Sequence, residues 1–153
     1  MRKRVLILCT GNSCRSQMAE GILRSIDPDL EVYSAGTFPA STVQSRAIQV
    51  LGEIGIDIGD QKPKSVHQFV DQPIDFLITV CDDARESCPT FHGDVGTRIH
   101  CGFDDPSFAT GSEEHVISEF RRVRDEIQRR LSELYTLVIN PQTNERDRTP
   151  RQR

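Results

Sequence analysis

Two cysteines, a glycine and an arginine directly follow a short apolar run near the start of the chain. The run VLIL, residues 5–8, leads into CTGNSCRS, residues 9–16, in which five residues separate Cys9 from Arg15. A loop that enters a helix turns backbone N–H groups toward one centre, and the helix dipole adds positive potential there. An arginine guanidinium is a permanently charged planar donor that suits a tetrahedral oxyanion. The stretch therefore predicts an oxyanion-binding loop with a cysteine at its start.

The same positive field would lower the pKa of the Cys9 thiol and favour the thiolate, the nucleophilic form. Ser16 could donate a hydrogen bond to that thiolate. The alternative is a buried cysteine and a surface arginine without a common role. Turn-forming residues between an apolar run and a helical pattern favour the chemical interpretation. The stretch lacks the Gly-Lys-Ser/Thr ending of a nucleotide P-loop, which excludes that motif.

Two further sites follow later apolar segments. Cys81 comes directly after FLITV, and Cys88 lies seven positions beyond it; Asp105 stands between Asp104 and Pro106 after a further strand candidate. In open α/β sheets ligands bind outside the carboxyl ends of the strands, so Cys9, Cys81 and Asp105 are expected at one crevice. Two thiols that become one disulfide supply two electrons, so this cysteine pair could serve a two-electron reduction.

The cysteine pair also has two simpler interpretations. Cys81 and Cys88 could be two buried thiols, or a zinc site completed by His92, His100 or Cys101. Six intervening residues exceed the usual spacing of about two to four in structural zinc sites, which disfavours zinc.

Alternating strand and helix patterns predict the elements that position these residues. Strands are expected over residues 4–9, 31–35, 74–80 and 97–100, and helices from Arg15 to about Ser25, over 43–54, over 65–70 and from residue 113 onward. The last helix carries an apolar stripe of period three to four, made up of Ile117, Phe120, Val123, Ile127, Leu131, Leu134 and Val138. This order predicts an α/β fold: a three-layer sandwich with a mostly parallel four-stranded sheet and helices on both faces.

The composition suits a single domain. The chain has 153 residues, 19 of them basic and 23 acidic, so a nucleic-acid partner is not expected. We predict one domain over residues 1–139 and a mobile polar tail over residues 140–153. Five cysteines without a signal peptide predict the reducing cytoplasm, no apolar run approaches transmembrane length, and the polar helix faces predict a monomer.

The motif CTGNSCRSQMAEG, residues 9–21, resembles the anion-binding loop of the low-molecular-weight tyrosine phosphatase fold. It resembles more closely the redox branch of that fold, the thioredoxin-coupled arsenate reductases. The resemblance continues through YSAG at 33–36, ITVCDDARESCP at 78–89, GFDDP at 102–106 and FRRVRDEI at 120–127. It implies an oxyanion site formed by Cys9, Thr10, Gly11, Asn12, Ser13, Cys14 and Arg15, in which Cys14 is a packing residue.

The resemblance implies a relay of three thiols. The Cys9 thiolate attacks arsenic while Asp105 protonates the departing oxygen, and Cys81 then attacks the Cys9 sulfur and releases arsenite. Cys88 attacks Cys81, which leaves a Cys81–Cys88 disulfide for thioredoxin to reduce. No bound cofactor is expected, and Cys101 has no role in the scheme.

Some relatives hold potassium beside this loop, and Asn12, Glu20 and Ser34 match its ligands. Lys64 stands where those relatives have a carboxylate, so its ammonium could pair with Glu20 in place of the metal. Two other functions stay open: a phosphatase acting on phosphotyrosine or small phosphoesters, and a non-enzymatic redox or oxyanion sensor. Ser107 after the Asp-Pro pair, where an aromatic residue would suit phosphotyrosine, favours the reductase over the phosphatase.

Overall fold

Four parallel strands form the centre of the computed structural model, which describes residues 2–141. The sheet order is β2-β1-β3-β4. The strands are β1 (Arg4–Cys9), β2 (Glu31–Gly36), β3 (Ile74–Thr79) and β4 (Val95–His100). Residues 5–8 of the central strand β1 are fully buried, as expected for an apolar run that is covered on both faces. The predicted α/β fold and its parallel sheet are confirmed.

Helices fill the connections between the strands. The α-helices are α1 (Arg15–Ile26), α2 (Ser45–Glu53), α3 (Asp82–Ser87) and α4 (Glu113–Leu134), and the shorter turns are η1 (Val66–Gln68), η2 (Pro106–Phe108) and η3 (Tyr135–Ile139). The segment predicted as a helix over 65–70 is only the single turn η1, and α3 is an element that the apolar pattern did not predict. No helix in the described part of the chain is both long and apolar enough to cross a membrane.

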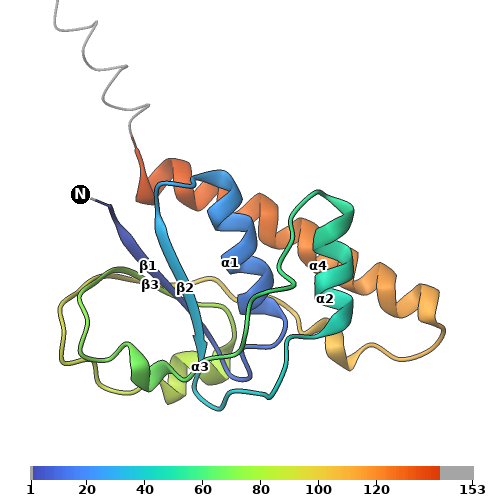
Figure 1. Cartoon of the computed structure of the whole chain (residues 1–153), viewed down its shortest axis with the longest axis horizontal. Helices are drawn as coiled ribbons and strands as arrows, with labels where there is room; N and C mark the ends of the chain where they lie inside the picture. Colours follow the sequence, from blue (N-terminus) through green and yellow to red (C-terminus); the bar gives the residue numbers. More distant parts are fainter. Residues whose placement is uncertain (1, 142–153) are drawn as a thin grey trace, which may run out of the picture.

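The helices divide between the two faces of the sheet. α1, α2 and α4 pack against one another on the same side (Figure 1). The step from β1 to β2 and the step from β3 to β4 run in opposite directions across the sheet. Because such crossovers are right-handed, α1 and α3 lie on opposite faces. This arrangement agrees with the predicted three layers.

Helix α1 packs on strands β1 and β2, and α4 packs on α1 and α2 within one continuous core. The predicted stripe of α4 is buried from Ile117 to Leu131, but Val138 is exposed. The α-helix ends at Leu134 and continues as the π-turn η3, which buries Ile139 instead. A π-turn holds more residues per turn, so the face that meets the core shifts by one position.

The domain and tail boundaries stay predictions. The described chain extends without a second core to residue 141, and the tail predicted over residues 140–153 lies almost wholly outside the described residues.

Candidate active site

The loop between β1 and α1 forms a cradle, which we define as residues 9–15. It lines a cavity of about 270 Å³ together with Asp83, Asp105 and Phe108. The loop carbonyls point away from this cavity, because the segment after β2 donates to the carbonyls of residues 9, 10, 11 and 13 through backbone N–H groups at 2.8–3.1 Å. The amides of the loop are thereby left to face the cavity, which suits an anion.

Asn12 holds the bend of the cradle. It is fully buried and adopts a φ of 52°, a left-handed conformation that asparagine tolerates better than most residues. Its Nδ2 donates to Ser16 Oγ at 2.8 Å and to Ser34 Oγ at 2.9 Å, and its Oδ1 accepts from the Lys64 backbone N–H at 2.8 Å. These three bonds tie the loop to α1, to β2 and to the segment after α2.

Gly36 lets the end of β2 approach the cradle. A β-carbon at this position would lie 2.5 Å from the Thr10 carbonyl oxygen and 3.1 Å from the Asn12 side chain. Only glycine fits this approach without displacing backbone.

Arg15 and Asp105 lie together at the mouth of the cradle. Arg15 Nη1 donates to the Phe103 carbonyl at 3.0 Å, and Nη2 contacts Asp105 Oδ2 at 3.3 Å. The other oxygen of Asp105 accepts from the backbone N–H and the hydroxyl of Ser107, at 3.0 and 2.7 Å. An entering oxyanion would meet both the guanidinium and the carboxyl group that the sequence predicted as the acid.

Cys9 lines the cavity, and the Cys81 thiol lies beside it, behind the lining residues. Cys9 ends β1 and is 4% exposed, and Cys81 directly precedes α3. Thr10 Oγ1 also lies 3.4 Å from the Cys81 sulfur. The predicted convergence of these two strand ends is therefore present in the fold.

The pKa values of these two thiols shift in opposite directions. The neighbouring Cys81 thiol, together with burial, raises the pKa of Cys9, although Arg15 opposes that shift. The interaction with Cys9, with those from Thr10 and the Ala84 backbone, lowers the pKa of Cys81 to about 5 despite burial. The two thiols therefore share one proton, and the lowered pKa predicted for Cys9 stays a prediction for the site with an anion bound.

Cys88 lies at the far end of α3. Cys81 and Cys88 flank the helix as its two caps, and seven residues of α-helix span about 10.5 Å. Burial raises the pKa of Cys88, while Arg98 beside it acts in the opposite direction. The helix must therefore change before these two sulfurs can bond, because disulfide Cα atoms lie within about 7 Å of each other.

Ser16 and Cys14 are both buried beside the cradle. The hydroxyl oxygen of Ser16 accepts a hydrogen bond from Asn12 Nδ2 and so helps to shape the loop, while its donation to the Cys9 thiolate stays a prediction. Cys14 is buried, and burial raises its pKa to about 12, which fits the predicted packing role.

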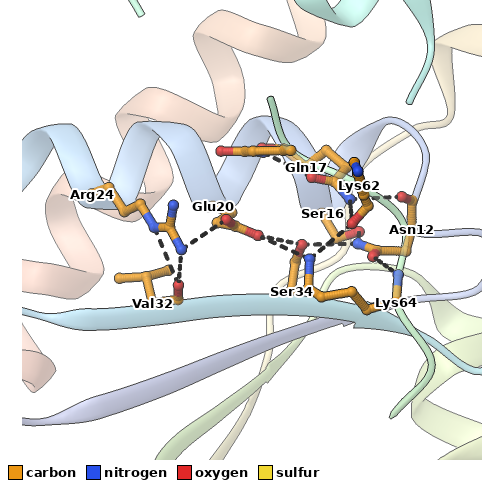
Figure 2. A network of polar contacts seen from close by, with 10 residues as sticks. Asn12, Ser16, Gln17, Glu20, Arg24, Val32, Ser34, Lys62 and Lys64 are labelled. Atoms are coloured by element: carbon orange, nitrogen blue, oxygen red, sulfur yellow. Dashed lines mark hydrogen bonds and ion pairs between the residues drawn. The ribbon is translucent and has the colours of Figure 1, made fainter. Parts of the chain in front are cut away.

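A buried polar network backs the cradle (Figure 2). Glu20 is 2% exposed; its Oε1 accepts from Ser34 Oγ at 2.6 Å and lies 3.8 Å from Lys64 Nζ, and its Oε2 contacts Arg24 at 3.0 Å. Burial lowers the pKa of Lys64, and the charge of Glu20 counteracts this. Two cations already neutralise the carboxylate, so these residues do not fit the potassium ion that the resemblance suggested.

The zinc alternative also lacks support. Residues 2–141 contain no group of three or more His, Cys, Asp or Glu side chains placed to hold a metal ion. Cys101 is buried, and burial raises its pKa.

Two residues that line the cavity were not predicted from the sequence. Phe108, 81% exposed, and Asp83 both border it. Asp83 lies two positions after Cys81, and Phe108 lies two positions after Pro106. Their closeness to these motif residues was the one sequence feature that could have indicated them.

A parallel sheet whose first strand ends in a cysteine–arginine cradle is the architecture of one phosphatase class. The chain belongs to the low molecular weight phosphotyrosine protein phosphatase family, whose pattern matches residues 4–145. Within it, the arsenate reductase of Shouchella clausii (strain KSM-K16) is 44% identical over 131 residues, which cover 85% of this chain and 93% of that protein.

Solved structures agree with this assignment. An arsenate reductase in the phosphate-binding state superposes with a TM-score of 0.74 at 28% identity, over 89% of this chain and 98% of that one. The low molecular weight protein tyrosine phosphatase from T. tengcongensis superposes with a TM-score of 0.73 at 27% identity, over 89% and 99%.

Proposed function

We propose that this protein is an arsenate reductase that works through Cys9, Cys81 and Cys88. The observation that carries the proposal is the placement of the Cys81 thiol next to the anion cradle, 3.4 Å from Thr10 Oγ1, with a third thiol one short helix away. A phosphatase has no use for the second and third thiols. The similarity to proteins named arsenate reductase supports the choice of substrate.

In the first step arsenate occupies the cradle and Arg15 turns from Asp105 toward the anion. The Cys9 sulfur then bonds to arsenic, and the displaced oxygen leaves as water with a proton from Asp105. Arrival of the anion also separates the thiol pair, and the field of Arg15 and the loop amides then favours the thiolate on Cys9.

Two sulfur exchanges complete the reduction. The Cys81 thiolate attacks the Cys9 sulfur, so that an S–S bond forms, the S–As bond breaks and its electron pair stays on arsenic, which leaves as arsenite. The Cys88 thiolate then attacks the Cys81 sulfur and releases the Cys9 thiolate. Two thiols have become one disulfide, which balances the two electrons taken up by arsenic.

The Cys81–Cys88 disulfide must be reduced before the next cycle. We propose that a thioredoxin dithiol does this, since disulfide exchange needs access to one of the two sulfurs. We expect the enzyme to act as a monomer, because one chain supplies every residue of the cradle and the relay. We place it in the cytoplasm, whose reducing conditions keep such thiols available.

Slow hydrolysis of aryl phosphates is a second activity that the site supports. The cradle accepts any tetrahedral oxyanion of similar size and charge, and the exposed ring of Phe108 lies on its rim, where it could contact an aromatic leaving group.

The test compares two activities in three proteins. Arsenite production with thioredoxin, thioredoxin reductase and NADPH is measured for the wild type, for Cys88→Ser and for the control Cys101→Ser, alongside p-nitrophenyl phosphate hydrolysis. We expect Cys88→Ser to abolish multiple turnover and to keep phosphatase activity, and Cys101→Ser to keep both. Loss of both activities or of neither in Cys88→Ser contradicts the relay. A disulfide that forms without turnover in the wild type would indicate a sensor.

A further inference from the structure

The edge strand β4 presents two charged or titratable side chains to the face that carries α3. The strand register pairs Leu77 with Arg98 and Thr79 with His100, so all four side chains project to the same side of the sheet. A cavity of about 270 Å³ lies on this face and is lined by these four residues together with Cys88 and Ile99. The third thiol of the proposed relay is thus placed against β4.

His100 joins the end of β3 to the start of α3. Its Nδ1 lies 2.7 Å from Thr79 Oγ1, and its Nε2 lies 3.0 Å from Asp82 Oδ1. Both ring nitrogens therefore have a partner, which fixes the orientation of the imidazole. Since Asp82 is the first residue of α3, this contact attaches the N-terminal end of the helix to the sheet.

Arg98 acts at the other end of the helix. Its side chain lines the same cavity as Cys88, the C-cap of α3, and its guanidinium lies over the ring of Phe91 with 5.9 Å to the centroid. Two residues of one strand thus lie at the two ends of the segment that links Cys81 to Cys88.

We propose that Arg98 and His100 are positioning residues that hold the redox segment, residues 81–88, in its reduced helical form with Cys88 seated on β4. The inference rests on the proposed thiol relay. When the Cys88 thiolate attacks the Cys81 sulfur and Cys9 leaves as thiolate, α3 has to unwind, the His100–Asp82 contact breaks and Cys88 moves away from Arg98. The two residues therefore set how readily the segment passes from dithiol to disulfide.

Contacts that exist only in the dithiol form stabilise that form. Removing one of them shifts the equilibrium toward the Cys81–Cys88 disulfide, by roughly three- to tenfold for a partly exposed hydrogen bond. Affinity of the cradle for phosphate stays unchanged, since neither residue lines that cavity.

The experiment is a titration of the full-length protein with reduced and oxidised dithiothreitol, without arsenate. The Cys81–Cys88 disulfide is quantified by differential alkylation and peptide mass spectrometry in His100→Phe, Asp82→Asn, the double variant and Arg98→Met. His115→Phe, a histidine exposed on α4, is the matched control. Phosphate affinity reports whether each variant keeps its fold.

We expect His100→Phe, Asp82→Asn and Arg98→Met each to favour the disulfide by about three- to tenfold, and His115→Phe to leave the equilibrium unchanged. The double variant should shift by less than the sum of the singles, because both single substitutions remove the His100–Asp82 contact. His100→Gln should bring the equilibrium most of the way back to the wild-type value, because the glutamine amide can donate to Asp82. If His100 had only a structural role, glutamine would not restore the equilibrium.

Unchanged equilibria, or additive effects of His100→Phe and Asp82→Asn, would overturn the proposal. Asp82→Asn is a surface substitution, so it decides the matter even if His100→Phe fails to fold. A wild type that forms no Cys81–Cys88 disulfide would also overturn it. Because the titration contains no arsenate, a shifted equilibrium without arsenite production would reject only the proposed function.

Discussion

The reactive residues of this protein act as pairs. The Cys9 and Cys81 thiols influence each other's pKa, and Arg15 forms an ion pair with Asp105, so each of these groups depends on a partner. In the mechanism we propose, an entering anion competes for Arg15 and separates the two sulfurs, so the charges of both pairs change together. The proposed chemistry thus begins with the rearrangement of these two contacts.

The first prediction concerns the Cys81 thiol. Because its pKa is lowered to about 5 from a usual 9.0, its thiolate is present above pH 5 and is lost below it. The rate of Cys81 alkylation by iodoacetamide, mapped by mass spectrometry, should have its midpoint near pH 5 in the wild type. Cys9→Ser should move the midpoint upward, since the interaction with Cys9 is the largest cause of the lowered pKa of Cys81. A wild-type midpoint near pH 9 would contradict the pairing.

The second prediction concerns the acid. Asp105→Asn should slow both arsenate reduction and p-nitrophenyl phosphate hydrolysis by about 10²- to 10⁴-fold, the usual contribution of a general acid, because an amide cannot transfer the proton. Asp104→Asn is the matched control. That neighbouring carboxylate is exposed and pairs with Arg122 outside the cavity, so its loss should change both rates by less than about twofold. Equal effects of the two substitutions would remove Asp105 from the mechanism.

At the scale of elements, a network of buried polar side chains holds the cradle in place. The side chain of Asn12 bonds to α1, β2 and the segment after α2, and Glu20 from α1 is neutralised between Lys64 and Arg24 (Figure 2). A buried carboxylate that loses one of its cations must find another or take up a proton. The Lys64 ammonium thus helps to neutralise Glu20 behind the cradle, as a bound metal ion could.

The third prediction follows from the position of Lys64 beside Glu20. Lys64→Ala should lower the phosphatase rate in sodium buffer, and potassium should restore part of it, because the vacated volume beside Glu20 can then hold a cation. The wild type and the control Lys62→Ala, an exposed lysine that uses only its backbone in the network, should respond equally little to either salt. Strong stimulation of the wild type by potassium would show that Lys64 does not occupy the cation position.

The fourth prediction concerns α3. Its two caps are Cys81 and Cys88, and a disulfide between them is incompatible with the helical spacing. Oxidation should therefore change the backbone amide shifts across residues 81–90 while residues 113–134 of α4 keep theirs. Unchanged shifts over 81–90 in the oxidised protein would exclude refolding.

At the scale of the whole molecule, the anion site couples distant parts of the chain. β1, α1 and the segment around η2 meet at the cavity through Cys9, Arg15 and Asp105. An anion bound there interacts only with the folded form, so binding stabilises the entire fold.

The fifth prediction measures that stabilisation. Phosphate at 100 times its Kd should add about 2.7 kcal/mol to the free energy of unfolding. For a chain of this size the gain corresponds to a rise in Tm of roughly 5–10 °C, measurable by calorimetry. Arg15→Ala should remove most of the rise, and Arg129→Ala, an exposed arginine paired with Glu133 on α4, should keep it. An equal rise in both variants would place phosphate elsewhere.

Much of the fold could be predicted because its signals are local. The apolar run before Cys9 predicts a buried strand, the turn residues after it predict a loop, and the helix at Arg15 completes the cradle. Because the strands are parallel, their carboxyl ends lie at one edge of the sheet, which is why Cys9, Cys81 and Asp105 could be expected there, whereas the strand order came only from the structure.

What the tertiary structure decided concerns contacts between elements. The six-residue helix α3 is too short to produce a periodic pattern, and the placement of His100 and Arg98 against it depends on the register between β3 and β4. The proton distribution between Cys9 and Cys81 likewise depends on the distance and burial of two sulfurs 72 positions apart. Sequence patterns encode the periodicity of one element at a time, whereas hydrogen bonds, burial and pKa values arise only where separate elements pack together.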